Sequence, residues 1–256
     1  MLSLFRMYLT ALILALSWTS SDAQTEKQEK PEHYTNEQVN PDPDFIPGSY
    51  AEPDALAAIQ HYNERVDALD PEGAMVLDVQ KEEGSEITWK AIKNQTASVL
   101  GYFRTFDGYL SFENGKFTKA ELLVSVNSLD SAVPDRDNRI KTIFFESMKP
   151  EMSTGVLVLD KILNGSPYLS AIQNGASHEL VATGLFTLGT VTLPVTVNLQ
   201  VTWDKEGETL SVQTSKPLAL LISDLDLEKN VSPLMKECNH KSLGNLVEIN
   251  CKLKFE

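Results

Sequence analysis

One stretch of the sequence, residues 191–203, constrains the fold more than any other. Thr, Pro, Asn and Gln alternate there with apolar side chains, which occupy every second position: Val191, Leu193, Val195, Val197, Leu199, Val201 and Trp203. A period of two predicts a β-strand with one apolar and one polar face. At about 3.3 Å per residue such a strand is roughly 40 Å long, which is long for a soluble protein.

The same period of two recurs through the chain after residue 74. It covers residues 75–79, 87–91, 120–126, 210–214 and 247–255, and Asn114-Gly115 is a strong hairpin signal. Turn residues around the first two segments predict that these form a hairpin. No helices alternate with the strands, which disfavours a parallel α/β fold. About eight strands predict an all-β sandwich or barrel. Long strands with a single apolar face favour a closed eight-stranded antiparallel barrel, and residues 135–146 are expected to form a short helical insert.

The part of the chain before residue 72 divides into three segments. Residues 1–23 have the pattern of a signal peptide, with Arg6 before an apolar run and cleavage expected near Ala23. Residues 24–48 are acidic and contain four prolines, which predicts a flexible arm. Within residues 49–71 a helix is expected, because apolar side chains recur at three- and four-residue steps: Leu56, Ile59, Tyr62, Val66 and Leu69. The protein is therefore expected to be periplasmic or secreted.

Charge and cysteine content narrow the possible partners. The formal net charge of −14 argues against nucleic acid and anionic membrane surfaces as main partners, so any membrane contact is expected to be transient. The two cysteines, Cys238 and Cys251, would be free to pair outside the cytoplasm, but the sequence leaves open whether they do. Neither cysteine spacing nor the acidic residues match a metal-binding pattern, so no metal site is expected.

Several short motifs carry a family resemblance. They lie in residues 127–150: Asn127-Ser128-Leu129-Asp130-Ser131, Asp135-Arg136-Asp137-Asn138-Arg139-Ile140, Phe144-Phe145-Glu146 and Pro150. With Gly101-Tyr102-Phe103 upstream and Leu188-Gly189-Thr190-Val191 downstream, they resemble the YceI-like family of polyisoprenoid-binding periplasmic proteins. The resemblance covers roughly residues 74–256, within a barrel domain expected at 72–256. It implies a lipocalin-like barrel whose apolar tunnel holds an isoprenoid lipid, such as a quinone with its tail, and which requires no other cofactor.

The resemblance and the alternation together select candidate ligand contacts. The apolar side chains expected to line the tunnel are Trp89, Phe103, Phe112, Val124, Val126, Phe144, Phe145, Phe186, Leu193, Val195, Val197 and Leu199. Arg136 and Arg139 are candidates for contact with a polar headgroup. Family members often carry a histidine in the segment matching Asn138-Arg139-Ile140 and another before the glycine matching Gly189. This chain has neither, so the resemblance does not extend to the identity of the headgroup.

Three functions compete at this point. The first is an exported carrier or store for a long apolar lipid. The second is a non-catalytic interaction module with a packed barrel, acting through its N-terminal arm and helix. The third, an enzyme acting on a lipid in the tunnel, is disfavoured because no nucleophile elbow, phosphate-binding glycine loop or paired catalytic acids can be recognised. We therefore expect no catalytic residues. Whether the barrel is hollow, and which lipid it takes, cannot be decided from the sequence.

Overall fold

The computed structural model describes residues 52–69, 71, 75–80, 84–175, 177–206 and 208–256, which all belong to one compact unit, residues 48–256. The predicted signal peptide and acidic arm lie outside the described residues. Within the described part of the chain, no helix combines the length and the apolar character needed to cross a bilayer.

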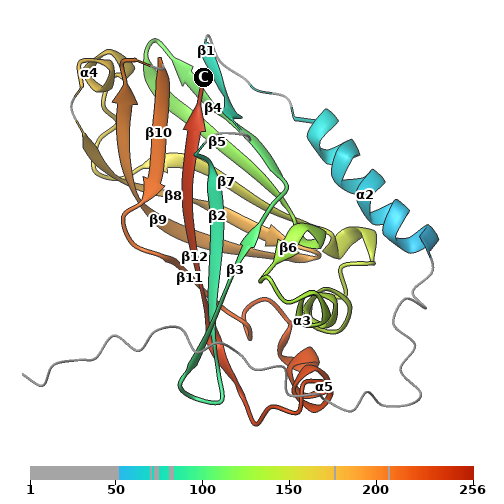
Figure 1. Cartoon of the computed structure of the whole chain (residues 1–256). Coiled ribbons are helices and arrows are strands. Elements are labelled where there is room, and N and C mark those ends of the chain that lie inside the picture. The colour runs from blue at the N-terminus through green and yellow to red at the C-terminus, as the bar shows by residue number, and fades with distance from the viewer. Residues whose placement is uncertain (1–51, 70, 72–74, 81–83, 176, 207) are drawn as a thin grey trace, which may run out of the picture. The chain divides into compact units, whose positions relative to one another are not determined.

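The described residues form a closed antiparallel β-barrel, as predicted (Figure 1). Four pairs of segments each continue one another as one interrupted strand, namely β1 with β2, β3 with β4, β5 with β6, and β10 with β11, so the segments make eight strands. Pairing of β1 with β12 closes the ring. The segments are β1 (Met75–Gln80), β2 (Glu86–Lys93), β3 (Ala97–Phe103), β4 (Phe106–Glu113), β5 (Lys116–Ser125), β6 (Leu129–Asp130), β7 (Thr154–Ile162), β8 (His178–Leu188), β9 (Val191–Asp204), β10 (Thr209–Thr214), β11 (Leu218–Leu221) and β12 (Leu243–Phe255).

The predicted hairpin between the first two strand segments is wrong. Both β1 and β2 pair with β12, through Val79 opposite Phe255 and Ile87 opposite Cys251, and they do not pair with each other. The long β12 offers one continuous edge to both. Alternation in the sequence reports which side chains face inward, but it does not report the partner strand. The other hairpin signal is confirmed, since Asn114 and Gly115 join β4 to β5 with positive φ angles of 51° and 74°.

The long central strand is also confirmed. β9 runs from Val191 to Asp204 and pairs with β8 from Val191 to Val201. Val195 and Val197 are buried, whereas Thr196 between them is exposed. Gly184 in β8 lies so close to the Val158 carbonyl oxygen of β7 that a side chain at this position would collide with it. A glycine is therefore required here, next to the irregularity in the β7–β8 ladder between Leu159 and Lys161.

Short helices cover the two ends of the barrel (Figure 1). Helix α4 (Leu169–Gln173) lies at one end, and α3 (Pro134–Arg139) and α5 (Glu228–Glu237) lie at the opposite end. The π-helix η2 (Ile140–Phe144) continues α3, which confirms the helical insert, and it packs against α5. Single 3₁₀ turns, η1 (Val126–Ser128) and η3 (Pro150–Met152), flank this insert. Each end therefore contributes its own set of apolar side chains to the interior.

The described interior contains three apolar clusters, the smallest of which surrounds Trp89 on β2. The cluster at the α4 end includes Phe112, Leu210 and Phe255 from the strands and Leu169 and Ile172 from α4. The cluster at the other end is formed by strand residues together with η2, α5 and the segment after β11. The cluster at the α4 end surrounds a cavity.

Helix α2 (Glu52–Asp67) packs on the outside of the barrel. Its Tyr62 is buried against Leu123 and Val156 of β5 and β7. The predicted apolar stripe is only partly correct, because Leu56 and Ile59 are 65% and 51% exposed. One face of α2 therefore presents Leu56 and Ile59 to solvent, while Ala58 and Tyr62 on the other face are buried.

Candidate functional site: an apolar cavity in the barrel

An apolar cavity of about 90 Å³ lies inside the barrel at the α4 end. Almost all of its lining is aliphatic or aromatic, and it comes from seven strand segments and from the loop and helix that close this end. The lining residues are Tyr109, Leu110, Phe112, Phe117, Ala120, Leu122, Leu157, Leu159, Ile162, Ser166, Pro167, Ile172, Leu180, Val197, Leu199, Val201, Leu210, Val212, Thr214, Cys251, Leu253 and Phe255. A site of this kind favours an apolar ligand.

The few polar residues of the lining offer little chemistry. The Tyr109 hydroxyl donates a hydrogen bond to Glu121 Oε2 at 3.1 Å. Burial raises the pKa of the Cys251 thiol to about 12, so this thiol stays protonated at neutral pH and is a poor nucleophile. Ser166 and Thr214 are the other two polar lining residues. No acid–base pair is therefore formed by the lining residues.

The cavity is small relative to a long lipid. An engineered cavity of about 150 Å³ admits benzene, so about 90 Å³ accommodates one small apolar group. A chain of several isoprene units requires lining side chains or α4 to move. Ile172 lines the cavity, and Leu169 packs in the surrounding cluster. Displacement of α4 would therefore enlarge the cavity at this end.

Three of the predicted tunnel residues line the cavity: Phe112, Val197 and Leu199. Val124 packs in the surrounding cluster, and Phe103 contacts both this cluster and the one around Trp89. Trp89 lies in the latter cluster. The other six predicted residues belong to or pack against the cluster at the α3 end: Val126, Phe144, Phe145, Phe186, Leu193 and Val195. The Phe144 and Phe145 rings meet edge to face, with centroids 4.9 Å apart. These side chains fill the barrel there, and ligand contact by any of the twelve stays a prediction.

Most of the lining was not among the predicted residues. Four of the missed residues lie in stretches where apolar and polar side chains alternate, so their inward orientation could have been predicted: Leu210, Val212, Leu253 and Phe255. By contrast, Ile172 and Pro167 follow no strand pattern. Their position depends on how the segment between β7 and β8 folds over the barrel end, which only long-range contacts determine.

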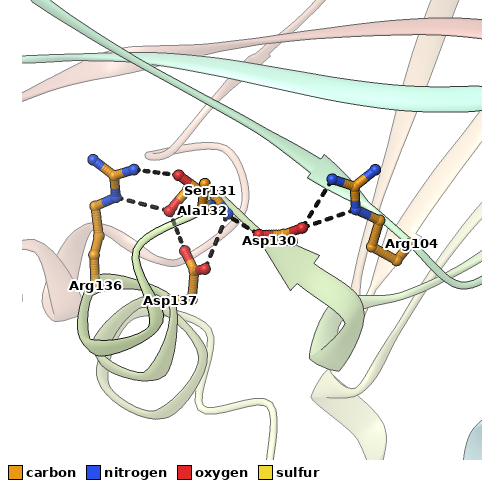
Figure 2. A network of polar contacts seen from close by, with 6 residues as sticks. All are labelled: Arg104, Asp130, Ser131, Ala132, Arg136 and Asp137. Atoms are coloured by element: carbon orange, nitrogen blue, oxygen red, sulfur yellow. Dashed lines mark hydrogen bonds and ion pairs between the residues drawn. The ribbon is translucent and has the colours of Figure 1, made fainter. Parts of the chain in front are cut away.

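The family motif forms a polar network at the α3 end (Figure 2). The buried Asp137 carboxylate accepts hydrogen bonds from the Ser131 backbone N–H, at 3.0 Å, and from the Ser131 hydroxyl. Arg136 donates to the Ser131 hydroxyl and carbonyl oxygens at 2.8 and 2.7 Å. Asp130 accepts from Arg104 and from the Ala132 backbone N–H, 2.9 and 2.8 Å away. The network therefore holds α3 to the end of β6.

The two arginines predicted to contact a headgroup do not line the cavity. Arg136 is engaged in the network with Ser131. Arg139 has a buried Nε without a hydrogen-bond partner, and its guanidinium lies near Cys238. Burial raises the pKa of the Cys238 thiol, and the nearby Arg139 opposes this rise. The structure thus separates the arginines from the cavity by the packed half of the barrel.

The cysteines are free thiols, so the question of a disulfide is answered in favour of two unpaired residues. Within the described ranges, no group of three or more His, Cys, Asp or Glu side chains is placed to hold a metal ion.

The fold and the cavity together define a class of protein: a closed eight-stranded antiparallel barrel with an apolar hollow in its interior. The model of the YceI-like domain matches residues 78–255, and the chain belongs to this family. The predicted family resemblance is confirmed. No match is found among curated protein sequences.

One solved structure supports the fold, and two others are similar at lower scores. A polyisoprenoid binding domain from Saccharophagus degradans, implicated in plant cell wall breakdown, superposes with a TM-score of 0.59 at 17% identity, over 70% of this chain and 97% of that one. BcnA of Burkholderia cenocepacia gives 0.49 at 16% identity, over 69% and 99% of the two chains. The YCEI protein of Campylobacter jejuni gives 0.47 at 17% identity, over 64% and 88%.

Proposed function

We propose that the barrel binds a long apolar lipid of the polyisoprenoid type, as an exported carrier or store and without catalysis. The observation that carries this proposal is the cavity at the α4 end, whose lining is almost wholly apolar. Burial of apolar area contributes about 25 cal/mol per Å² before the costs of ordering the chain. The family and the polyisoprenoid binding domain of Saccharophagus degradans add support.

The polar groups of the lining favour binding over catalysis. A lipid-modifying enzyme would need a nucleophile or an acid–base pair next to the chain. Cys251 is held protonated by burial, and the Tyr109 hydroxyl is engaged with Glu121. Contact of Arg136 or Arg139 with a headgroup stays a prediction. It would require a chain that extends from the cavity through the packed half of the barrel.

The proposal is tested by extracting the purified protein with organic solvent and analysing the extract by mass spectrometry. We expect an isoprenoid lipid from the wild type. Val197→Trp, which fills the cavity, should lose it, whereas Thr196→Trp, on the exposed face of β9, should retain it. Equal lipid content in both variants, or no binding of added isoprenoid by the folded wild type, would contradict the proposal.

A second function is favoured by one observation, the exposed apolar side chains of α2. Leu56 and Ile59 are more than half exposed, as in a helix that contacts another protein. If the wild type binds no lipid and Leu56→Glu abolishes co-purification of a partner, the interaction module replaces the lipid carrier.

A further inference from the structure

The barrel wall is interrupted between β10 and β11. The ladder to β12 stops at Gln213 opposite Lys252 and resumes at Leu218 opposite Ile249. Five residue steps from β10 to β11 thus match three along β12, so the segment between β10 and β11 contains two extra residues and forms a β-bulge. Ser215 still donates its backbone N–H to the Asn198 carbonyl of β9 at 2.9 Å. The wall therefore opens only toward β12.

The side chain of Thr214 closes this opening. Its Oγ1 accepts a hydrogen bond from the Cys251 backbone N–H at 3.2 Å and lies 3.4 Å from both the Cys251 carbonyl oxygen and Asn250 Oδ1. The hydroxyl thus replaces the backbone partner that the bulge removes. One hydroxyl has a single proton to donate, so the closure depends on few and long hydrogen bonds.

A polar hollow of about 180 Å³ lies at the same place; we call it the outer hollow. Its lining comes from β2, β10 and β12: Glu86, Thr88, Gln213, Thr214, Asn250, Cys251 and Lys252. Thr214 and Cys251 also line the apolar cavity. The apolar cavity and the outer hollow therefore meet at these two residues.

We propose that the outer hollow binds the headgroup of the lipid whose chain occupies the cavity, and that the two are joined through the side of the barrel at Thr214. This inference rests on the proposed function and adds the place and chemistry of headgroup recognition. A rotation of the Thr214 side chain would open the path, and a hydroxyl or carbonyl of the ligand would replace its hydrogen bonds to Cys251. The headgroup then reaches solvent without passing the packed α3 end.

The chemistry of the outer hollow selects a neutral headgroup. The amides of Gln213 and Asn250 supply both donors and acceptors. Glu86 and Lys252 face each other across β2 and β12 and carry opposite charges. A phosphate would meet one cation and one anion there, so these charges together would contribute little to its binding free energy. A neutral alcohol, phenol or quinone carbonyl on an isoprenoid chain would find donors and acceptors without a charge mismatch.

The test uses three probes that share one chain: phytane, phytol and phytyl phosphate. Binding is measured by isothermal titration with the full chain. We expect Asn250→Leu and Gln213→Leu each to weaken phytol binding about three- to tenfold, the worth of one hydrogen bond, while phytane binding stays unchanged. The matched control is Ser211→Val on β10, outside the outer hollow, which should change neither.

A second measurement does not depend on these substitutions. The thiol of Thr88→Cys would stand in the outer hollow, and phytol, but not phytane, should slow its labelling by maleimide. Unchanged labelling and unchanged phytol affinity would overturn the inference. So would tighter binding of phytyl phosphate than of phytol together with its loss in Arg139→Gln, because the headgroup would then lie at the α3 end.

The probes also separate this inference from the function on which it rests. If wild-type protein binds phytane but the variants bind phytol normally, only the headgroup site fails. If it binds none of the three probes, the lipid-binding function itself fails, and the headgroup site with it.

Discussion

A carboxyl group placed on the inner face of β9 should destabilise the barrel strongly, whereas one placed on its outer face should not. Val197 is 3% exposed, lines the cavity and pairs with the fully buried Ala182. Its neighbour Thr196 is exposed and pairs with Thr183. The pair Val197→Asp and Thr196→Asp therefore compares the same substitution on the two faces of one strand.

The expected difference follows from two terms. Loss of the buried valine costs about 1.5–3 kcal/mol. Keeping the new carboxyl inside an apolar lining raises its pKa by about three units or more, which at neutral pH adds about 4 kcal/mol. Val197→Asp should thus lose more than about 5 kcal/mol of unfolding free energy, a large part of a typical total of 5–15 kcal/mol. Thr196→Asp should stay within about 0.5 kcal/mol of wild type.

Urea denaturation over a range of pH tests both terms. The pKa of the new carboxyl is raised in the folded state, so the protonated form is favoured by folding. Val197→Asp should have a lower unfolding free energy than Thr196→Asp. This difference should be smallest below about pH 4, near the pKa of Asp in the unfolded chain, and should grow as pH rises toward the pKa of the carboxyl in the folded protein. Equal stabilities of the two variants, or a deficit independent of pH, would refute the inward orientation of Val197.

Three further predictions concern other parts of the fold. Asp137→Asn should lower the unfolding free energy by about 1.5–3 kcal/mol, because a buried charged acceptor of two hydrogen bonds is lost. The control is Asp135→Asn at an exposed position, and equal urea midpoints of the two variants would contradict the role of the network. The Cys251 thiol, with its pKa raised to about 12, should not react with Ellman's reagent at pH 8 until the protein is unfolded in urea; rapid reaction of this thiol in the native protein would show that it is accessible. Gly184→Ala should lower the thermal midpoint, since its methyl group meets a carbonyl oxygen of β7 and overpacking costs about 1–3 kcal/mol; an unchanged midpoint would mean that the strands can separate there.

The cavity has a consequence for how the barrel would take up its ligand. At about 90 Å³ it holds only part of a long chain. Beside it lie α4 and the bulge after Thr214, together with ladder irregularities at Phe112 and Leu159. Helix α4 has five residues and its first backbone N–H, from Leu169, bonds the Gly115 carbonyl at 2.7 Å. Chain uptake at α4 and headgroup binding at the bulge would place the two parts of the lipid at neighbouring sites.

Local patterns in the sequence determined the strand content and the inward face of the barrel. The alternation in residues 191–203 predicted β9 and its buried valines, because successive side chains of a strand point to opposite faces whatever the partner strand is. The motif around Asp137 predicted the helical insert and the family. It did not reveal that Arg136 is engaged with Ser131, because that contact depends on the conformation of the intervening turn.

Only the tertiary structure decided which strands pair, where the barrel is hollow and where its wall is open. β1 and β2 share the edge of β12, and Ile172 closes a cavity lined by strands far away in the sequence. The meeting of the cavity and the outer hollow at Thr214 depends on the registers of β10 and β11 against β12. Strand register and closure are set by contacts between residues distant in the chain, and a period of two carries no information about them.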